Sequence, residues 1–122
     1  MPKVVFDSSF LLAVVERPTT WFEDMTELLG GLEPVTLDCV LAEMDRLSVG
    51  QGRRGRYASL AKQLASKFQV AKAGRAGVDE EIVSYALANG AAVATLDREL
   101  IGALKGLRVK VVTLRAGRVA RV

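Results

Sequence analysis

Short apolar runs alternate with segments of helical spacing along most of the chain. The first run, residues 4–6, is Val-Val-Phe; it is too short for a helix and favours a strand buried on both faces. Asp7 ends this run, and apolar residues follow it three, four and seven positions further on, which places them on one helical face. Asp7 is therefore expected where a buried strand passes into a helix. In an open α/β sheet, ligands bind at this edge, outside the carboxyl ends of the strands.

The same alternation predicts five strands and six helical segments. The strands are expected at Lys3–Phe6, Pro34–Leu37, Gln69–Ala73, Ala91–Leu96 and Val109–Leu114. Helices are expected at Ser8–Val15, Trp21–Leu29, Cys39–Val49, Asp79–Ala88 and Asp97–Lys105, with a further helical spacing at Tyr57, Leu60, Leu64 and Phe68. Gly50–Arg56 is expected to be a basic glycine-rich loop, and residues 115–122 a short basic tail after a single domain of residues 1–114. Strands alternating with helices indicate right-handed crossovers and a parallel sheet with helices on both sides.

The composition narrows the chemistry that the chain could perform. Its 122 residues suit one domain, half of them are hydrophobic, and the net charge of +3 is a mild indication of a polyanionic partner. The single cysteine, Cys39, excludes an internal disulfide and fits a reducing cytosol. No apolar run approaches the roughly 18–20 residues of a transmembrane helix, so we expect a cytoplasmic protein without membrane contact. The absence of histidine excludes Ser-His-Asp and Cys-His catalysis and histidine-ligated zinc.

Four acidic residues share the phase of the apolar stripes. Asp7, Asp79 and Asp97 each precede apolar residues at helical spacing, and Glu43 lies mid-helix beside such a stripe. Helix capping or the helix dipole explains each aspartate equally well when it is taken alone, and a salt bridge or a solvent-reaching side chain would explain Glu43. Together they could converge on one end of a parallel sheet. Four such carboxylates need a cation, and oxygen ligands without His or Cys favour Mg²⁺ or Mn²⁺.

The motifs around these acids resemble those of the PIN-domain nucleases. They read VVFDSSFLL, TLDCVLAEMDRL, VDEEIVSYA and VATLDREL, and KVVTLR resembles the last strand of that family. The set is most similar to the archaeal and ribosome-assembly type. The resemblance implies a three-layer α/β/α fold with a central, mainly parallel five-stranded sheet. It also implies a Mg²⁺- or Mn²⁺-dependent ribonuclease that hydrolyses phosphodiester bonds of single-stranded RNA, with Asp7, Glu43, Asp79 and Asp97 as catalytic and metal-binding residues.

Three further residues are expected to support that site. Thr95 matches a hydroxyl position of the family, and Ser9 stands where asparagine is frequent. Glu99 matches an additional acid of many members, although an exposed helix charge explains it equally well. In such a site, a divalent ion lowers the pKa of water, and a second ion about 3.5–4 Å away would stabilise the leaving oxygen. The sequence leaves the number of ions open.

The sequence indicates the role of its basic residues and the identity of its partners less specifically than it indicates the acid site. Arg53, Arg54 and Arg56 could bind RNA phosphates or could simply be solvated charges. Trp21 and Phe22 are expected in the core or in a homodimer contact. An antitoxin or a ribosome-assembly factor is an alternative partner, and toxin and RNA-processing roles both stay open.

A PIN-fold RNA-binding or assembly factor with little or no catalysis is the second interpretation. A phosphoacceptor receiver-like domain would need a lysine at the fifth strand, which residues 111–114 lack.

Overall fold

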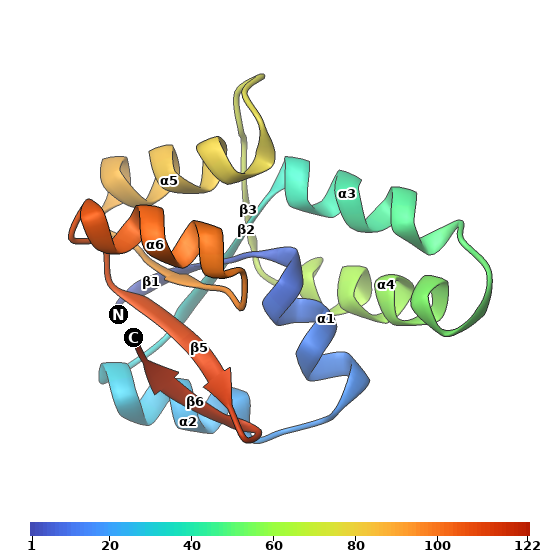
Figure 1. Ribbon diagram of the computed structural model, residues 1–122, viewed down its shortest axis with the longest axis horizontal. Helices are drawn as coiled ribbons and strands as arrows, with labels where there is room; N and C mark the ends of the chain where they lie inside the picture. The colour runs from blue at the N-terminus through green and yellow to red at the C-terminus, as the bar shows by residue number, and fades with distance from the viewer.

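The computed structural model describes all 122 residues as a sheet of six strands with six helices (Figure 1). In chain order the elements are β1 (Lys3–Phe6), α1 (Ser8–Glu16), α2 (Trp21–Leu29), β2 (Glu33–Leu37), α3 (Asp38–Ser48), α4 (Gly52–Ala65), β3 (Gln69–Ala71), α5 (Val78–Asn89), β4 (Ala92–Ala94), α6 (Arg98–Gly106), β5 (Val111–Arg115) and β6 (Arg118–Arg121). None of the helices combines the length and the apolar character needed to cross a membrane.

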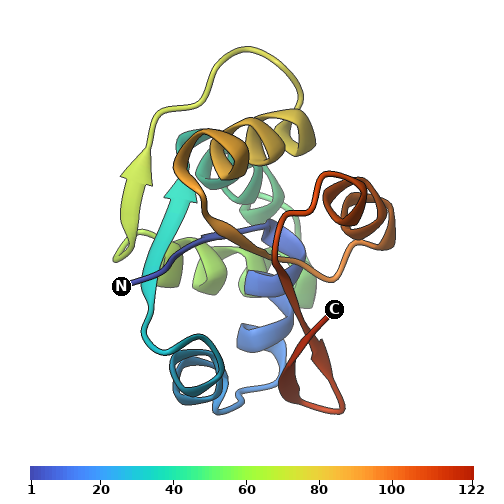
Figure 2. The same cartoon turned by 90° about the vertical axis from the view of Figure 1, so that its left-hand side faces the viewer.

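The strands are ordered β3-β2-β1-β4-β5-β6, and β1 lies near the centre of the sheet. Neighbours from β3 to β5 pair in parallel, and β6 alone runs antiparallel to its neighbour. Figures 1 and 2 show α5 and α6 on one side of the sheet and α1, α2 and α4 on the other. The predicted three-layer α/β/α fold with a mainly parallel sheet is confirmed, with six strands in place of five.

The core forms around β1 because that strand is covered on both faces. Val4, Val5 and Phe6 are completely buried, as the uninterrupted apolar run predicts. The Phe6 ring has edge contacts with Phe10 of α1 and Trp21 of α2, at centroid distances of 5.4 and 5.5 Å. These contacts hold α1 and α2 against the strand and fix the position of the residue that follows it, Asp7.

Trp21 and Phe22 differ in their surroundings although they are adjacent. Trp21 packs against the core and lies near Phe6, Phe10 and Phe68, so its predicted core role is confirmed. Phe22 is 47% exposed, so for this residue the core prediction is wrong. Successive helical residues point about 100° apart, and only one of the two can face the sheet.

The prediction of a loop at Gly50–Arg56 is wrong, because α4 begins at Gly52. The helix starts so early because its buried face is made of small residues, which are Gly55, Ala58, Ala61 and Ala65. These residues let α4 pack closely against α3 and α1. A Cβ atom at Gly55 would overlap the carbonyl oxygen of Gly50, so only glycine fits the entry to the helix. Tertiary packing here outweighs the low helix propensity of glycine.

The same packing corrects the predicted core stripe of this segment. Leu60 is 42% exposed and Tyr57 is half-buried outside the core, whereas Leu64 packs against the core, to which Ala61 and Ala65 also belong. The periodicity therefore predicts the helix correctly, but of the four larger apolar residues at this spacing only Leu64 and Phe68 pack against the core. Phe68 lies beyond the end of the helix and joins the aromatic cluster of the core.

Residues 115–122 are not an irregular tail, contrary to the prediction. Arg118–Arg121 forms β6, which pairs with β5 through a tight turn in which Ala116 and Gly117 both have positive φ, +50° and +78°. The guanidinium of Arg118 donates two hydrogen bonds to the Asp24 carboxylate of α2, of 2.8 and 2.9 Å. This bidentate pair ties the added strand to the helix layer, a contact that strand periodicity alone does not reveal.

Candidate functional site

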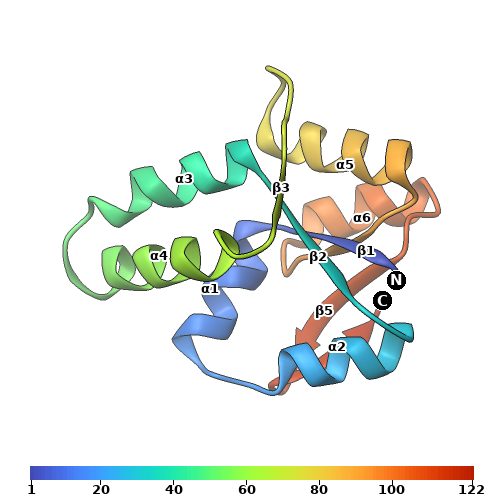
Figure 3. The ribbon, with the colours of Figure 1, turned by 180° about the vertical axis from the view of Figure 1, so that it is seen from behind.

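The four predicted acids lie at the carboxyl edge of the sheet or on helices that begin there. Asp7 directly follows β1, Asp97 is the N-cap residue of α6, Asp79 is in the first turn of α5, and Glu43 is in the second turn of α3. Because β2, β1 and β4 are parallel neighbours, their carboxyl ends meet at one edge. Figures 1 and 3 show the first turns of α1, α3, α5 and α6 around the end of β1.

Two hydroxyl groups hold the Asp7 carboxylate, which is only 5% exposed. Ser9 Oγ and Thr95 Oγ1 each donate to Asp7 Oδ2 at 2.7 Å. The same hydroxyl oxygens accept hydrogen bonds from the backbone, Ser9 from Leu96 N at 2.9 Å and Thr95 from Asp97 N at 3.0 Å. The hydroxyls therefore join the end of β1 to the segment after β4.

Asp7 and Asp97 are anchored in different ways. Asp97 Oδ1 accepts hydrogen bonds from Glu99 N at 2.9 Å and Leu100 N at 3.3 Å, so it caps α6 as the capping explanation expects. Asp7 makes no such bond to the first turn of α1, and for this residue the capping explanation is wrong. In both residues one carboxylate oxygen is engaged, and the other accepts no hydrogen bond from the protein.

The pKa of Asp79 responds to the negative charges of the other three acids. Its pKa is raised above the ordinary value, first by loss of hydration and then by the negative charges of Asp7 and Asp97, with smaller contributions from Glu80 and Glu43. Like charges raise the pKa of a carboxyl because they disfavour its ionised form. The acids that the sequence grouped by phase are therefore electrostatically coupled in the structure.

Glu43 has a feature that ordinary helix packing does not explain. Its Oε1 atom is buried and has no hydrogen-bond partner. The alternative that Glu43 forms a salt bridge is wrong, since the molecule's two ion pairs join Lys62 to Asp45 and Arg118 to Asp24. An unpartnered buried carboxylate oxygen is unfavourable by roughly 1–3 kcal/mol or more, and native proteins retain such groups where another role requires them.

A concavity of about 510 Å³ opens beside these acids, between α5 and α6. Asp79 and Glu80 line it on the α5 side, and Glu99 lines it on the α6 side together with Leu100. The structure thus places Glu99 near the predicted acids, although the side chain is exposed. Glu80 was not singled out by the sequence, where it stands as an ordinary charge in a helix's first turn. Its position next to Asp79 is the signal that could have identified it.

The predicted RNA-binding arginines do not join the acid group. Arg53, Arg54 and Arg56 are exposed and lie in the first turns of α4, at the end of the α3–α4 hairpin away from the start of α3 (Figures 1 and 3). Glu43 lies in the half of α3 nearer the sheet. The structure therefore separates these cations from the acids by the outer part of the hairpin.

The acids at the sheet edge suit a hard divalent cation, since their donor atoms are carboxylate oxygens and the chain contains no histidine. The unpartnered Glu43 Oε1 and the free oxygens of Asp7 and Asp97 are available to such an ion. No three acidic or cysteine side chains are, however, arranged so as to hold a metal ion directly. Ion binding would therefore require side-chain adjustment.

Comparisons with known proteins identify the family and the fold. The family described as a PIN like domain matches residues 4–117. No curated protein sequence matches the chain. The PIN domain endonuclease Utp24 superposes with a TM-score of 0.81 at 19% identity, over 98% of this chain and 90% of that one.

Two other solved structures share the fold. A domain of a functionally unknown protein from Methanocaldococcus jannaschii has a TM-score of 0.66 at 14% identity, over 95% of this chain and 93% of that chain. PAE2754 from Pyrobaculum aerophilum has a TM-score of 0.58 at 17% identity, over 83% of this chain and 78% of that chain. The structural likenesses show the fold of PIN-domain nucleases, and since the family match spans nearly the whole chain, this protein belongs to the PIN-like domain family.

Proposed function

We propose that this chain is a Mg²⁺- or Mn²⁺-dependent endoribonuclease that hydrolyses phosphodiester bonds of single-stranded RNA. The observation that carries the proposal is that Asp7, Glu43, Asp79 and Asp97 lie around one edge of the sheet, where loss of hydration, followed by the neighbouring negative charges, raises the pKa of Asp79. Coupled carboxylates without a countercharge repel one another, and a divalent cation removes that repulsion. A PIN-domain endonuclease with the same fold, Utp24, supports the assignment to nucleases.

Asp7, Glu43, Asp79 and Asp97 would hold the ion. When bound, a divalent ion supplies Lewis acidity, which generates hydroxide near neutral pH and stabilises charge on the phosphate. The chain itself offers no histidine and needs no side-chain nucleophile for this chemistry. Its own contribution is to hold the four carboxylates at the same edge of the sheet, with Asp7 and Asp97 fixed by hydrogen bonds.

Ser9 and Thr95 have positioning roles in this proposal. Their hydroxyls donate to Asp7 Oδ2 and leave Oδ1 free to face an ion. Because Thr95 also accepts from Asp97 N, it fixes the spacing between the first and the last acid. Glu80 and Glu99 line the adjoining concavity, where they would limit how closely the RNA phosphates approach until cations are present.

RNA cleavage by matched variants tests the proposal. With Mg²⁺ or Mn²⁺ the chain should cut single-stranded RNA, and EDTA should stop the reaction. Asp97→Asn should reduce cleavage by at least about a hundredfold, because it removes a ligand charge while the amide oxygen still caps α6. Glu23→Gln, which removes an exposed acid from α2, is the matched control and should cleave as the wild type does. Activity that persists in both Asp97→Asn and Asp7→Asn would come from a contaminating nuclease and would refute the assignment.

A second candidate is a PIN-fold RNA-binding or assembly factor with little or no catalysis. It is favoured by the observation that no three acidic side chains already form a cation site. Such a factor would bind RNA with and without divalent ions and would not cleave any of a varied set of substrates. Purification of the native complex would identify the partner in either case. The candidates are a ribosome-assembly factor, an antitoxin and a second copy of the chain.

A further inference from the structure

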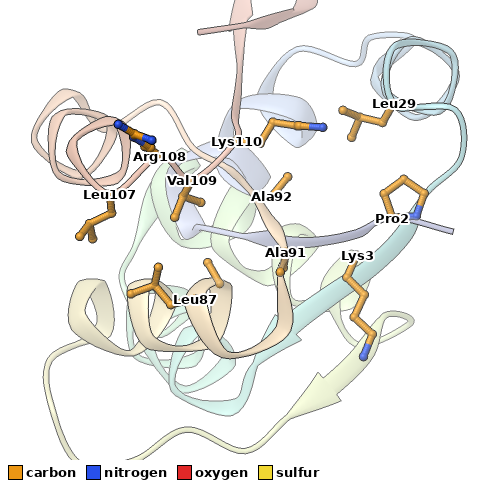
Figure 4. A pocket seen from close by; sticks show the side chains of 12 residues that line it. Pro2, Lys3, Leu29, Leu87, Ala91, Ala92, Leu107, Arg108, Val109 and Lys110 are labelled. Carbon is orange, nitrogen blue, oxygen red and sulfur yellow. The ribbon is translucent and has the colours of Figure 1, made fainter.

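A second concavity lies at the opposite edge of the sheet from the acids. It has a volume of about 320 Å³ and opens where β1, β4 and β5 begin (Figure 4). Its apolar lining includes Leu29, Ala92 and Val109. Because β1, β4 and β5 are parallel, their amino ends share an edge, and the pocket is separated from the acid group by the length of the strands. Nothing in the proposed nuclease chemistry uses this pocket.

The pocket carries positive charge that nothing in the molecule neutralises. Lys3, Arg108 and Lys110 are among its twelve lining residues, and no acidic residue is. None of the three takes part in an ion pair, since the two ion pairs of the molecule lie elsewhere. An apolar floor with an uncompensated basic rim attracts a ligand that combines apolar and anionic groups.

Arg108 occupies a backbone position at which glycine is usual. Its φ is +60°, and it follows the end of α6, where Val109 N bonds to Leu104 O at 3.0 Å and Arg108 N to Lys105 O at 3.1 Å. A left-handed conformation is unfavourable for a residue with a Cβ atom. An arginine in place of glycine therefore lowers stability while adding a cation to the rim. Backbone strain of this kind is concentrated at functional sites.

Apolar surface extends from the pocket onto the molecular surface. Leu87 of α5 is 55% exposed and Leu107 is 47% exposed, and both line the pocket. Figure 4 shows these leucines on the same side of the pocket as Arg108, while Lys3 and Lys110 lie elsewhere around it. A contiguous exposed apolar area bordered by polar groups is typical of a protein interaction site.

The arrangement of the cations selects among anionic partners. In Figure 4 the side chains of Lys3, Arg108 and Lys110 point in different directions, so they do not form a nest for one compact phosphate group. The lining contains no aromatic residue on which a nucleobase could stack. Charges distributed around an apolar floor instead match an extended peptide. We propose that this pocket binds an acidic segment of a partner protein, with an apolar side chain over Ala92 and Val109 and carboxylates near the three cations.

Selection of peptides on the full chain tests this proposal. A random-peptide phage library would be selected on the immobilised wild-type protein, and the enriched sequences would be synthesised and their affinities measured by fluorescence anisotropy. The selected peptides should contain Asp or Glu on both sides of a Leu, Ile or Phe. Their affinity should fall by roughly tenfold when Lys3, Arg108 and Lys110 are together changed to Gln, and it should also fall as salt is raised.

Arg108→Gly separates a binding role from a structural one. Glycine relieves the left-handed conformation, so this variant should melt at a higher temperature than the wild type and yet bind the peptides more weakly. Arg46→Gln, which removes an exposed cation from α3, is the matched control and should bind as the wild type does. Selected peptides without acidic residues, or equal binding by Arg108→Gly, would overturn the proposal. So would a short oligouridine whose affinity depends on the same three cations, since that result would assign the pocket to RNA.

Discussion

Thr95 is the residue on which the geometry of the acid edge depends most directly. It is completely buried, donates to Asp7 Oδ2 at 2.7 Å and accepts from Asp97 N at 3.0 Å. Valine has nearly the same shape but lacks the hydroxyl, so Thr95→Val leaves the part-buried Asp97 amide and the buried Asp7 carboxylate each with one hydrogen-bond partner fewer. Removing one partner from a buried hydrogen-bond network lowers the free energy of unfolding by about 1–3 kcal/mol.

We therefore expect Thr95→Val to lower the free energy of unfolding by about 1–3 kcal/mol and to reduce RNA cleavage. Urea denaturation followed by circular dichroism measures the first effect. Thr113→Val is the matched control, because Thr113 is a buried strand residue whose hydroxyl makes no hydrogen bond within the protein. If both substitutions change the stability equally, the hydroxyl of Thr95 does not support the acid edge.

Glu43 shows what the sequence can and cannot provide at the scale of one residue. Its phase beside the apolar stripe indicated that it faces inward, and the structure places it among charges that raise the pKa of Asp79. The sequence could not show that Oε1 is buried without a partner, because that depends on which side chains of other elements fail to reach it. The spacing of apolar residues predicts which side of the helix Glu43 occupies. Its hydrogen-bond partners depend on the three-dimensional arrangement of the other elements.

At the scale of elements, the segments with strong local patterns were predictable. Lys3–Phe6 and Trp21–Leu29 have the bounds that the sequence indicated, because an apolar run and an amphipathic stretch each specify their own structure. The start of α4 and the whole of β6 were missed. Glycines in α4 are read as loop residues unless their close packing is known, and β6 is stabilised by β5 and by Asp24 of α2, which lie far from it in sequence.

The ion pair between α2 and β6 predicts a specific dependence of stability on pH. Hydrogen bonds from the Arg118 guanidinium, with further ones from Val119 N and Thr20, lower the pKa of Asp24 from an ordinary 3.8 to about 2. A carboxyl whose pKa is lower in the folded state stabilises that state fully above the unfolded pKa. This stabilisation is lost as the pH falls from about 4 towards about 2.

We expect Asp24→Asn to be less stable than the wild type near neutral pH and to lose less stability between pH 4 and pH 2. Urea unfolding at a series of pH values measures the difference. Glu23→Gln removes the neighbouring, exposed charge of the same helix and should leave the wild-type slope unchanged in this range. Parallel curves for wild type and Asp24→Asn would mean that the pair contributes nothing to stability.

The first turns of α4 carry a prediction about RNA. Arg53, Arg54 and Arg56 are exposed, whereas the small residues of the helix make its packing contacts, so the three arginines can be changed to Gln without loss of the fold. If they bind phosphates, RNA binding should weaken, and the slope of log affinity against log salt should decrease by about 0.7 for each phosphate that is no longer neutralised. Filter binding at several salt concentrations measures this slope. An unchanged slope would leave these arginines as solvated surface charge.

At the scale of the whole molecule, the parallel sheet separates two regions of opposite charge. The acids follow the carboxyl ends of the strands, and Lys3, Arg108 and Lys110 lie at the amino ends. The net charge of +3 is therefore not representative of the local charge at either edge of the sheet. Phosphates are repelled by the acid edge unless cations are bound there, which makes cation binding the step that must come before RNA cleavage in the proposed function.

That order gives the last prediction, which concerns cation binding without RNA. Any ligand that binds the folded chain and not the unfolded one raises stability, by about 2.7 kcal/mol when its concentration is a hundredfold above Kd. Mn²⁺ should therefore raise the melting temperature of the wild type, measured by scanning calorimetry, and EDTA should reverse the rise. Asp7→Asn should remain folded, because the amide oxygen can still accept hydrogen bonds from Ser9 and Thr95. It should nevertheless lose most of the rise in melting temperature, since the site has lost one ligand charge.

Glu23→Gln should keep the full rise in melting temperature. An equal shift in the wild type and in Asp7→Asn would show that Mn²⁺ binds elsewhere on the molecule, and the four-carboxylate site would then have to be abandoned.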